Sequence, residues 1–192
     1  MSNILPPEAV KKVNDYNQDM KYADSASVRG KLDRFMRSKL HKFWNIESIF
    51  PIKEKKLQFA GVDSIIKIHG QQPIRVEEKV RRLTRKDILV ELIADNRYYL
   101  KGHRGLGWGL KNYTTDLLVY FFEDTQTGFI FHWEKFQKAL IQNLPEWYDL
   151  AKKEQYGFSL KKAQNKKYYS LNIVIPQNAM LHAYKNAGGI II

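Results

Sequence analysis

Two carboxylates and a lysine between residues 61 and 79 have the types and the spacing of a metal-dependent hydrolytic site. Asp63 directly follows a Gly-Val pair, and Glu77 and Lys79 stand two residues apart in a run of apolar and charged residues. Because side chains alternate faces along a strand, Glu77 and Lys79 would share one face and Glu78 would lie on the other. Two carboxylates can hold a hard cation such as Mg²⁺, which polarises a phosphodiester and favours a bound hydroxide. A lysine could orient that water or offset developing charge, so these residues predict phosphodiester hydrolysis.

The same residues also have a purely structural interpretation. An Asp followed at a distance by [DE]-x-K is a permissive pattern, and exposed hairpins often carry Glu and Lys as cross-strand pairs. Two features favour chemistry. Asp63 comes directly after Gly-Val, and residues 74–80 mix apolar and charged positions in an order that is awkward for a structural strand.

A predicted β-hairpin would bring these groups together. Residues 62–68 and 74–80 each predict a strand, and the Gly- and Pro-containing segment between them predicts a tight turn. In such a pair, Asp63 at the start of the first strand lies near the charged residues of the second strand. We therefore expect the acidic groups and the lysine to converge at one edge of a sheet.

An amphipathic helix is predicted before the hairpin. Apolar residues recur at helical spacing from Ser27 to Trp44, and basic residues fill the other face. Ser25 or Ser27 can cap its start.

The remaining segments alternate between strand and helix patterns. Strands are predicted over 88–93, 117–122, 128–132 and 169–175, helices over 133–143, 146–155 and 177–184, and loops over 98–115 and 161–167. Pro145 would end the first of these helices. We expect a layered α+β or α/β fold. Residues 1–25 would form an N-terminal arm, 26–145 the core, and 146–192 a helix-and-strand extension packed on that core.

Composition limits the function classes. The 192 residues include 32 Lys and Arg against 20 Asp and Glu, a formal charge of +12 that favours nucleic acid as the partner. The absence of cysteine excludes disulfides, zinc–thiolate sites and cysteine nucleophiles. No apolar run reaches the roughly 18–20 residues of a membrane span, and no signal-peptide pattern opens the chain. We expect a cytoplasmic protein that does not bind membranes.

The motifs Gly61-Val62-Asp63 and Val76-Glu77-Glu78-Lys79 resemble those of the PD-(D/E)XK nuclease superfamily, and more narrowly a group of its phage and prophage members. The resemblance implies a three-layer, restriction-endonuclease-like core of αβββαβ type, in which helices flank a central mixed sheet. It also implies that Asp63 and Glu77 bind Mg²⁺, which Mn²⁺ can replace, that Lys79 is the catalytic lysine, and that the protein acts in a bacterial or phage-infected cell.

Later segments resemble the same group: ILVEL contains Glu91, and GWGLKNYTTD contains Trp108 and Lys111. Glu91 lies in an otherwise apolar strand, where an unpaired carboxylate is costly. It is therefore either paired with a base for structural reasons or an additional acidic residue of the site.

The opening helix of that group also has a counterpart here, the LDRF segment that contains Asp33. Candidates for an acidic residue from this region are Asp24, Asp33 and Glu47, of which we favour Asp33. The alternative for Asp33 is an ion pair on the helix surface with Arg29 or Arg37, four residues away in either direction.

Basic residues around these motifs suit a polyanion. A cluster directly follows the candidate lysine, and a second set alternates with glycines in the loop that contains Trp108. That tryptophan would either stack on a base or pack inward. We expect nucleic-acid contacts from Arg81, Arg82, Arg85, Lys86, Lys101, Arg104, Trp108 and Lys111.

The sequence thus predicts a Mg²⁺-dependent nuclease that acts most simply on DNA. Two alternatives stay open: a non-catalytic nucleic-acid-binding module on the same fold, and a protein-interaction factor whose basic face meets an acidic protein. A homodimer would suit an enzyme that cuts both strands.

Overall fold

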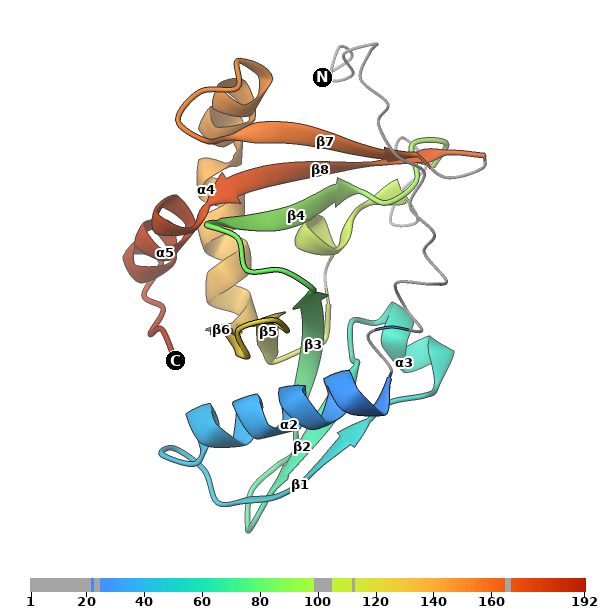
Figure 1. Cartoon of the computed structure of the whole chain (residues 1–192), viewed down its shortest axis with the longest axis vertical. Coiled ribbons are helices and arrows are strands. Elements are labelled where there is room, and N and C mark those ends of the chain that lie inside the picture. The colour runs from blue at the N-terminus through green and yellow to red at the C-terminus, as the bar shows by residue number, and fades with distance from the viewer. Residues whose placement is uncertain (1–21, 23–24, 99–104, 112, 165–166) are drawn as a thin grey trace.

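The computed structural model describes residues 22, 25–98, 105–111, 113–164 and 167–192 as a mixed α/β structure built on two sheets (Figure 1). The strands are β1 (Ile46–Pro51), β2 (Ser64–Ile68), β3 (Ile74–Arg81), β4 (Asp87–Ile93), β5 (Leu117–Phe122), β6 (Thr127–His132), β7 (Ser159–Gln164) and β8 (Tyr169–Pro176). The helices are α2 (Ala26–Leu40), α3 (Lys55–Phe59), η2 (Trp108–Leu110), α4 (Trp133–Lys152) and α5 (Gln177–Asn186). The predicted α+β class is confirmed, while the restriction-endonuclease-like assignment stays a prediction.

The larger sheet has five strands in the order β1-β2-β3-β5-β6. It is mixed, because β3 and β5 are parallel and the other neighbours are antiparallel. The predicted hairpin is confirmed as β2 and β3. The strand β4 does not join this sheet: it pairs with β8, and β8 with β7, in a separate antiparallel sheet. The chain therefore leaves the first sheet after β3 and returns to it at β5.

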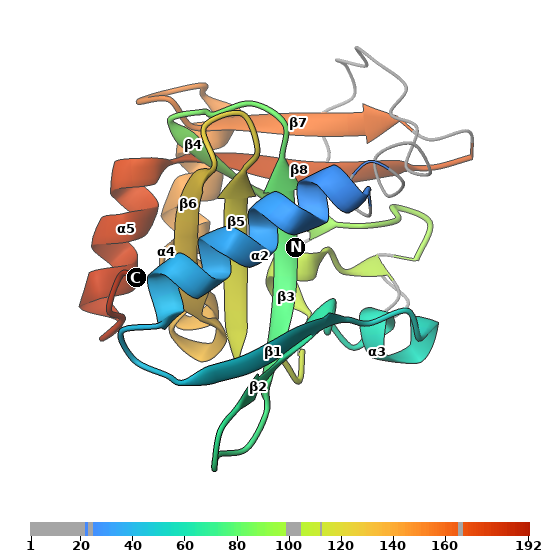
Figure 2. The same ribbon diagram turned by 60° about the horizontal axis from the view of Figure 1, so that its bottom comes forward.

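The helix α2 covers one face of the mixed sheet and crosses β3, β5 and β6 (Figure 2). The Ser25 hydroxyl caps its start by accepting a hydrogen bond from the Val28 backbone N–H at 3.4 Å. Its buried side chains pack on Ile66, Val76, Leu117, Val119, Phe121 and Ile130. The helix ends at Leu40, before the predicted end at Trp44. Phe43, which the prediction placed on the apolar face, is 55% exposed.

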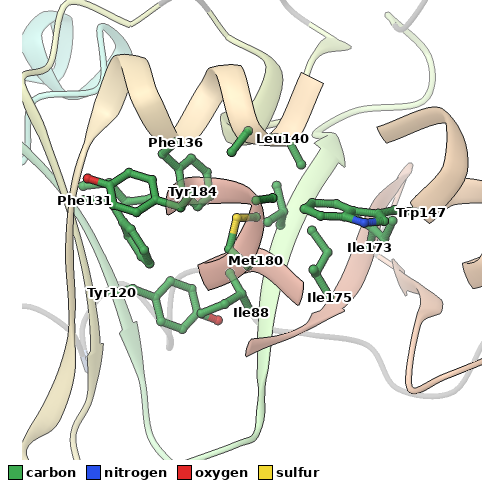
Figure 3. Packing of buried hydrophobic residues seen from close by; sticks show 14 of the residues in the cluster. Ile88, Tyr120, Phe131, Phe136, Leu140, Trp147, Ile173, Ile175, Met180 and Tyr184 are labelled. Atoms are coloured by element: carbon green, nitrogen blue, oxygen red, sulfur yellow. The ribbon is translucent and has the colours of Figure 1, made fainter. Parts of the chain in front are cut away.

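The second apolar cluster fills the space between the other face of the mixed sheet, the smaller sheet, α4 and α5. Figure 3 shows its central side chains, which include Ile88, Tyr120, Phe131, Phe136, Leu140, Trp147, Ile173, Ile175, Met180 and Tyr184. Two tyrosine hydroxyls also link these layers, since Tyr120 accepts from Leu89 N–H at 3.0 Å and Tyr184 accepts from His132 N–H at 2.9 Å.

The prediction of two helices separated at Pro145 is wrong, because one helix of 20 residues, α4, contains this proline. Buried Phe136, Leu140 and Trp147 continue the apolar stripe past it. An interior proline costs about 3 kcal/mol, and burial of this face on both sides offsets the loss. The carbonyl left without a partner belongs to Ile141, which is 55% exposed. None of the described helices is both long and apolar enough to cross a membrane.

The prediction of a loop from residue 161 is wrong as far as Gln164, because this segment belongs to β7, an edge strand paired only with β8 among the described strands. The loop was predicted because the adjacent basic residues Lys161 and Lys162 are typical of an exposed loop. Lysine is common on edge strands, where it discourages further pairing.

Candidate active site

The hairpin places Asp63 opposite Glu77. Ser64 pairs with Val76 in the register of β2 and β3, and Asp63 extends this pairing by donating its backbone N–H to the Val76 carbonyl at 2.8 Å. The Asp63 carboxylate also accepts the backbone N–H of Glu78 at 2.9 Å. Asp63 is therefore fixed against β3 by backbone contacts.

Strand alternation sends Glu77 and Lys79 to one face and Glu78 to the other, as predicted. Glu77 is 2% exposed and forms an ion pair with Lys79. On the opposite face, Glu78 pairs with Arg29 of α2 and accepts the Ser64 hydroxyl at 2.7 Å. A polar contact with α2 on the opposite face of the sheet thus fixes the part of β3 that carries Glu77 and Lys79.

A glycine two residues before Asp63 leaves room for an aromatic ring to pack on the backbone. Gly61 has φ +79°, and a Cβ there would collide with the ring of Tyr113. The Tyr113 ring thus packs directly on the backbone that leads to Asp63. Burial, followed by the negative charge of Glu77, raises the pKa of the Tyr113 hydroxyl.

The second sheet contributes Glu91 from β4. Its carboxylate accepts a backbone hydrogen bond from Trp108 and interacts with the charges of Lys79 and Lys111. The segment before Trp108 packs closely on β4, since Gly107 donates its N–H to the Leu92 carbonyl at 2.9 Å. Glu91 therefore lies within electrostatic range of Lys79 and Lys111, but within the described residues it forms an ion pair with neither.

Trp108 packs inward, as one of its two alternatives predicts. It is 8% exposed and stacks on Phe136 with ring centroids 5.9 Å apart. Its ring lies 5.2 Å from the Lys79 Nζ and forms a cation–π contact. Trp108 thus holds the lysine in place and is not an exposed stacking platform.

The site has more negative than positive charge close to Glu77. Burial raises the pKa of Glu77 to about 7, and Asp63 adds to the rise, while Lys79 opposes it. Burial opposes the charged form of Lys79, but the attraction of Glu77 and then Asp63 outweighs it and raises the lysine pKa. Burial likewise raises the pKa of Glu91, against the effect of Lys79. One lysine therefore cannot neutralise all of these carboxylates.

A divalent cation fits this donor set. Asp63 and Glu77 interact directly, so a proton or a cation relieves their repulsion. Within the described residues, no group of three or more His, Asp or Glu is arranged to hold a metal ion. Mg²⁺ is commonly bound by one or two carboxylates together with waters and substrate phosphates. Two hard oxygen donors are thus sufficient for Mg²⁺.

The structure does not bring Asp33 to the site. Asp33 lies on α2, which covers the opposite face of the sheet. It forms an ion pair with Arg37 at 3.0 Å, as the alternative prediction of an ion pair on the helix surface has it. Glu47 is exposed on β1, and Asp24 lies outside the described residues.

The basic residues that we expect to contact nucleic acid lie in different parts of the structure. Arg82, Arg85 and Lys86 are exposed in the turn after β3, and Arg81 is the last residue of that strand. Lys111 lies near the site, with its Nζ 5.9 Å from the Tyr113 ring. Lys101 and Arg104 lie outside the described residues.

The sequence did not predict the position of Tyr113 or the contacts of Arg29 and Ser64 with Glu78. Gly61 next to an acidic motif was a usable signal for close packing, but nothing local indicates which ring packs there. The basic face of α2 contains several candidates for the partner of Glu78.

Comparisons of this chain with protein families, with curated proteins and with solved structures found no match. The resemblance to PD-(D/E)XK nucleases therefore stays a prediction that rests on the motifs of residues 61–79 and on the similar segments that contain Asp33, Glu91, Trp108 and Lys111.

Proposed function

We propose that this chain is a divalent-metal-dependent nuclease of the PD-(D/E)XK type that hydrolyses phosphodiester bonds, most simply those of DNA. The observation that carries the proposal is the placement of Asp63 opposite Glu77, with Lys79 on the same strand face as Glu77. The covering helix α2, the antiparallel order β1-β2-β3 and the parallel pairing of β5 with β3 support the first four elements and the last strand of an αβββαβ core. The described part of the connection from β3 to β5 differs from this pattern, because it holds β4 and the short helix η2 in place of the expected α-helix.

Asp63 and Glu77 would hold Mg²⁺, or Mn²⁺ in its place. A bound ion of this kind polarises a phosphodiester and lowers the pKa of a bound water. The protein would hold both carboxylates in fixed positions. Asp63 accepts a hydrogen bond from the backbone of β3, and Glu77 is buried and forms an ion pair with Lys79.

Lys79 would act as a fixed positive charge. Its raised pKa keeps the ammonium protonated at neutral pH, so it donates hydrogen bonds and does not serve as a base. Glu77 and the face of Trp108 hold it from two directions. In that position it can orient the attacking water and offset charge on the phosphate, while exposed Arg82 and Arg85 contact the flanking backbone.

A second candidate is a non-catalytic nucleic-acid-binding protein on the same fold. One observation favours it: the Glu77 side chain is 3% exposed and already paired with Lys79, so a metal ion must displace part of that contact. We propose a cytoplasmic location for either activity, and a homodimer would suit cleavage of both strands.

The test is cleavage of supercoiled plasmid, linear duplex, single strand, a four-way junction and RNA, each with Mg²⁺, Mn²⁺ or EDTA. Glu77→Gln removes one charge from the site, and Glu47→Gln, at an exposed position on β1, is the matched control. We expect metal-dependent cleavage by the wild type and by Glu47→Gln, and none by Glu77→Gln.

Two outcomes contradict the nuclease proposal. Cleavage that persists in Glu77→Gln would place the chemistry elsewhere. Absence of cleavage of every substrate, with salt-sensitive binding retained, would favour the non-catalytic protein.

A further inference from the structure

Two loops distant in the sequence are joined at one end of the smaller sheet (Figure 1). One follows β4, and the other leads into β8. Asn96 donates its backbone N–H to the Tyr169 carbonyl at 3.1 Å, and Tyr169 donates its own N–H to the Asn96 side-chain oxygen at 2.9 Å. This reciprocal pair fixes the two loops relative to each other.

The joined loops carry aromatic rings in contact with cations. The guanidinium of Arg97 lies 5.4 Å from the ring centroid of Tyr98 and 4.8 Å from that of Tyr168. Lys162 lies 5.0 Å from the Tyr169 ring. Tyr98 is 38% exposed, and Tyr168 and Tyr169 are half-buried. We call Tyr98, Tyr168 and Tyr169, with Arg97 and Lys162, the aromatic platform.

The surroundings of the platform are basic. Asp95 is the sole acidic residue among the described residues 95–98, 159–164 and 167–169, and it pairs with Arg97 at 2.6 Å. Lys161 and Lys167 are exposed on the neighbouring strand and loop, and neither has an ion pair within the described part of the chain. Stacking surfaces beside lysines are the combination that binds single-stranded nucleic acid.

The platform is connected to the candidate active site through β4. The strand β4 carries Glu91, and Ile93 forms an antiparallel bridge with Leu106 where the chain returns to Trp108. Arg97 is six residues beyond Glu91, so extended chain separates them by at most about 20 Å. One nucleic-acid strand can therefore reach both places.

We propose that the aromatic platform binds an unpaired segment of nucleic acid adjacent to the bond that is cut. Bases in a duplex are stacked on each other, so their faces are open to protein rings only where the strand is single. The lysines around the platform contact the phosphates of the same segment. The link to cleavage rests on the proposed function, whereas binding by the platform does not.

The test measures fluorescence anisotropy of a labelled oligothymidylate of about 15 nucleotides with the full chain in EDTA. The same measurements use oligouridylate and a blunt duplex of similar length. The variants are Tyr98→Ala, Tyr168→Ala and Tyr98→Phe. The matched control is Tyr156→Ala, since Tyr156 is 82% exposed in the turn before β7.

We expect Tyr98→Ala and Tyr168→Ala each to weaken single-strand binding about tenfold, which is about 1.4 kcal/mol. Tyr98→Phe keeps the ring and should bind like the wild type, as should Tyr156→Ala. Duplex affinity should change less than about twofold in every variant. Effects on the DNA oligomer, the RNA oligomer or both would each support the platform and identify the sugar that it accepts.

Three outcomes would overturn the platform: a wild type that binds neither oligomer, alanine variants that bind as well as the wild type, or equal losses on single strand and duplex. These results are separate from those for the nuclease. Platform-dependent binding without any cleavage would refute the nuclease alone, and Glu77-dependent cleavage with unaffected single-strand binding would refute the platform alone.

Discussion

The buried carboxylate of Glu77 predicts an unusual pH dependence of stability in the absence of metal. Its pKa is raised from 4.5 to about 7, mainly by burial. Because the folded-state pKa lies above the unfolded-state value, the stability that this group contributes is fully present below the unfolded pKa. It is lost as the pH rises through about 7.

The magnitude follows from the size of the shift. Each pKa unit corresponds to about 1.4 kcal/mol, so ionisation of Glu77 lowers the free energy of unfolding by about 3 kcal/mol above pH 7. Glu77→Gln is neutral at every pH. We therefore expect the variant to exceed the stability of the wild type by less than about 1 kcal/mol near pH 5 and by about 3 kcal/mol near pH 8.

Urea denaturation in EDTA between pH 5 and pH 8 measures this difference directly. In thermal melts it corresponds to roughly 6–12 °C for a chain of this size. Titrating groups that do not interact with Glu77 are common to both proteins and cancel in the comparison, whereas the pKa values of Lys79 and Asp63 respond to the substitution and contribute to the measured difference. Glu47→Gln, at an exposed position on β1, should show no such pH-dependent gain. Mg²⁺ should stabilise the wild type at pH 8 and leave Glu77→Gln unchanged.

A stability difference between wild type and Glu77→Gln that is constant from pH 5 to pH 8 would refute the reasoning. It would mean that Glu77 is ionised throughout this range and that Lys79 alone balances its charge. A Mg²⁺ effect of equal size in both proteins would remove Glu77 from the proposed metal ligands.

Three further predictions concern single positions. Gly61→Ala should lower the free energy of unfolding by more than about 2 kcal/mol in urea denaturation, because its φ is +79° and a Cβ meets Tyr113. Lys79→Met should abolish cleavage in the plasmid assay and leave single-strand binding in EDTA within about threefold. Pro145→Ala should stabilise the protein by about 1–3 kcal/mol, measured in the same way, because it restores a helix N–H within α4.

Each of these has a clear contrary result. Wild-type stability of Gly61→Ala would show that the contact with Tyr113 is not tight. Cleavage by Lys79→Met would remove the lysine from the mechanism. Destabilisation by Pro145→Ala would show that the proline stabilises α4 through its own packing.

The sequence by itself determined the local geometry of the candidate site. Alternation along residues 74–80 places Glu77 and Lys79 on one face, and a short turn makes the hairpin that sets Asp63 opposite Glu77. The helix α2 likewise follows from its apolar spacing and its serine cap. These features depend on residues in one helix or in two strands joined by a short turn, so the local pattern contains the information needed to predict them.

Only the tertiary structure decided what surrounds that hairpin. The pairing of β4 with β8 directs Glu91 towards Lys79, and close packing against β4 turns Trp108 inward. The position of α2 directs Asp33 away from the site, and burial on both sides of Pro145 keeps α4 continuous. In each case, burial of a whole face against a distant element outweighs the local preference, and a sequence pattern does not specify that partner.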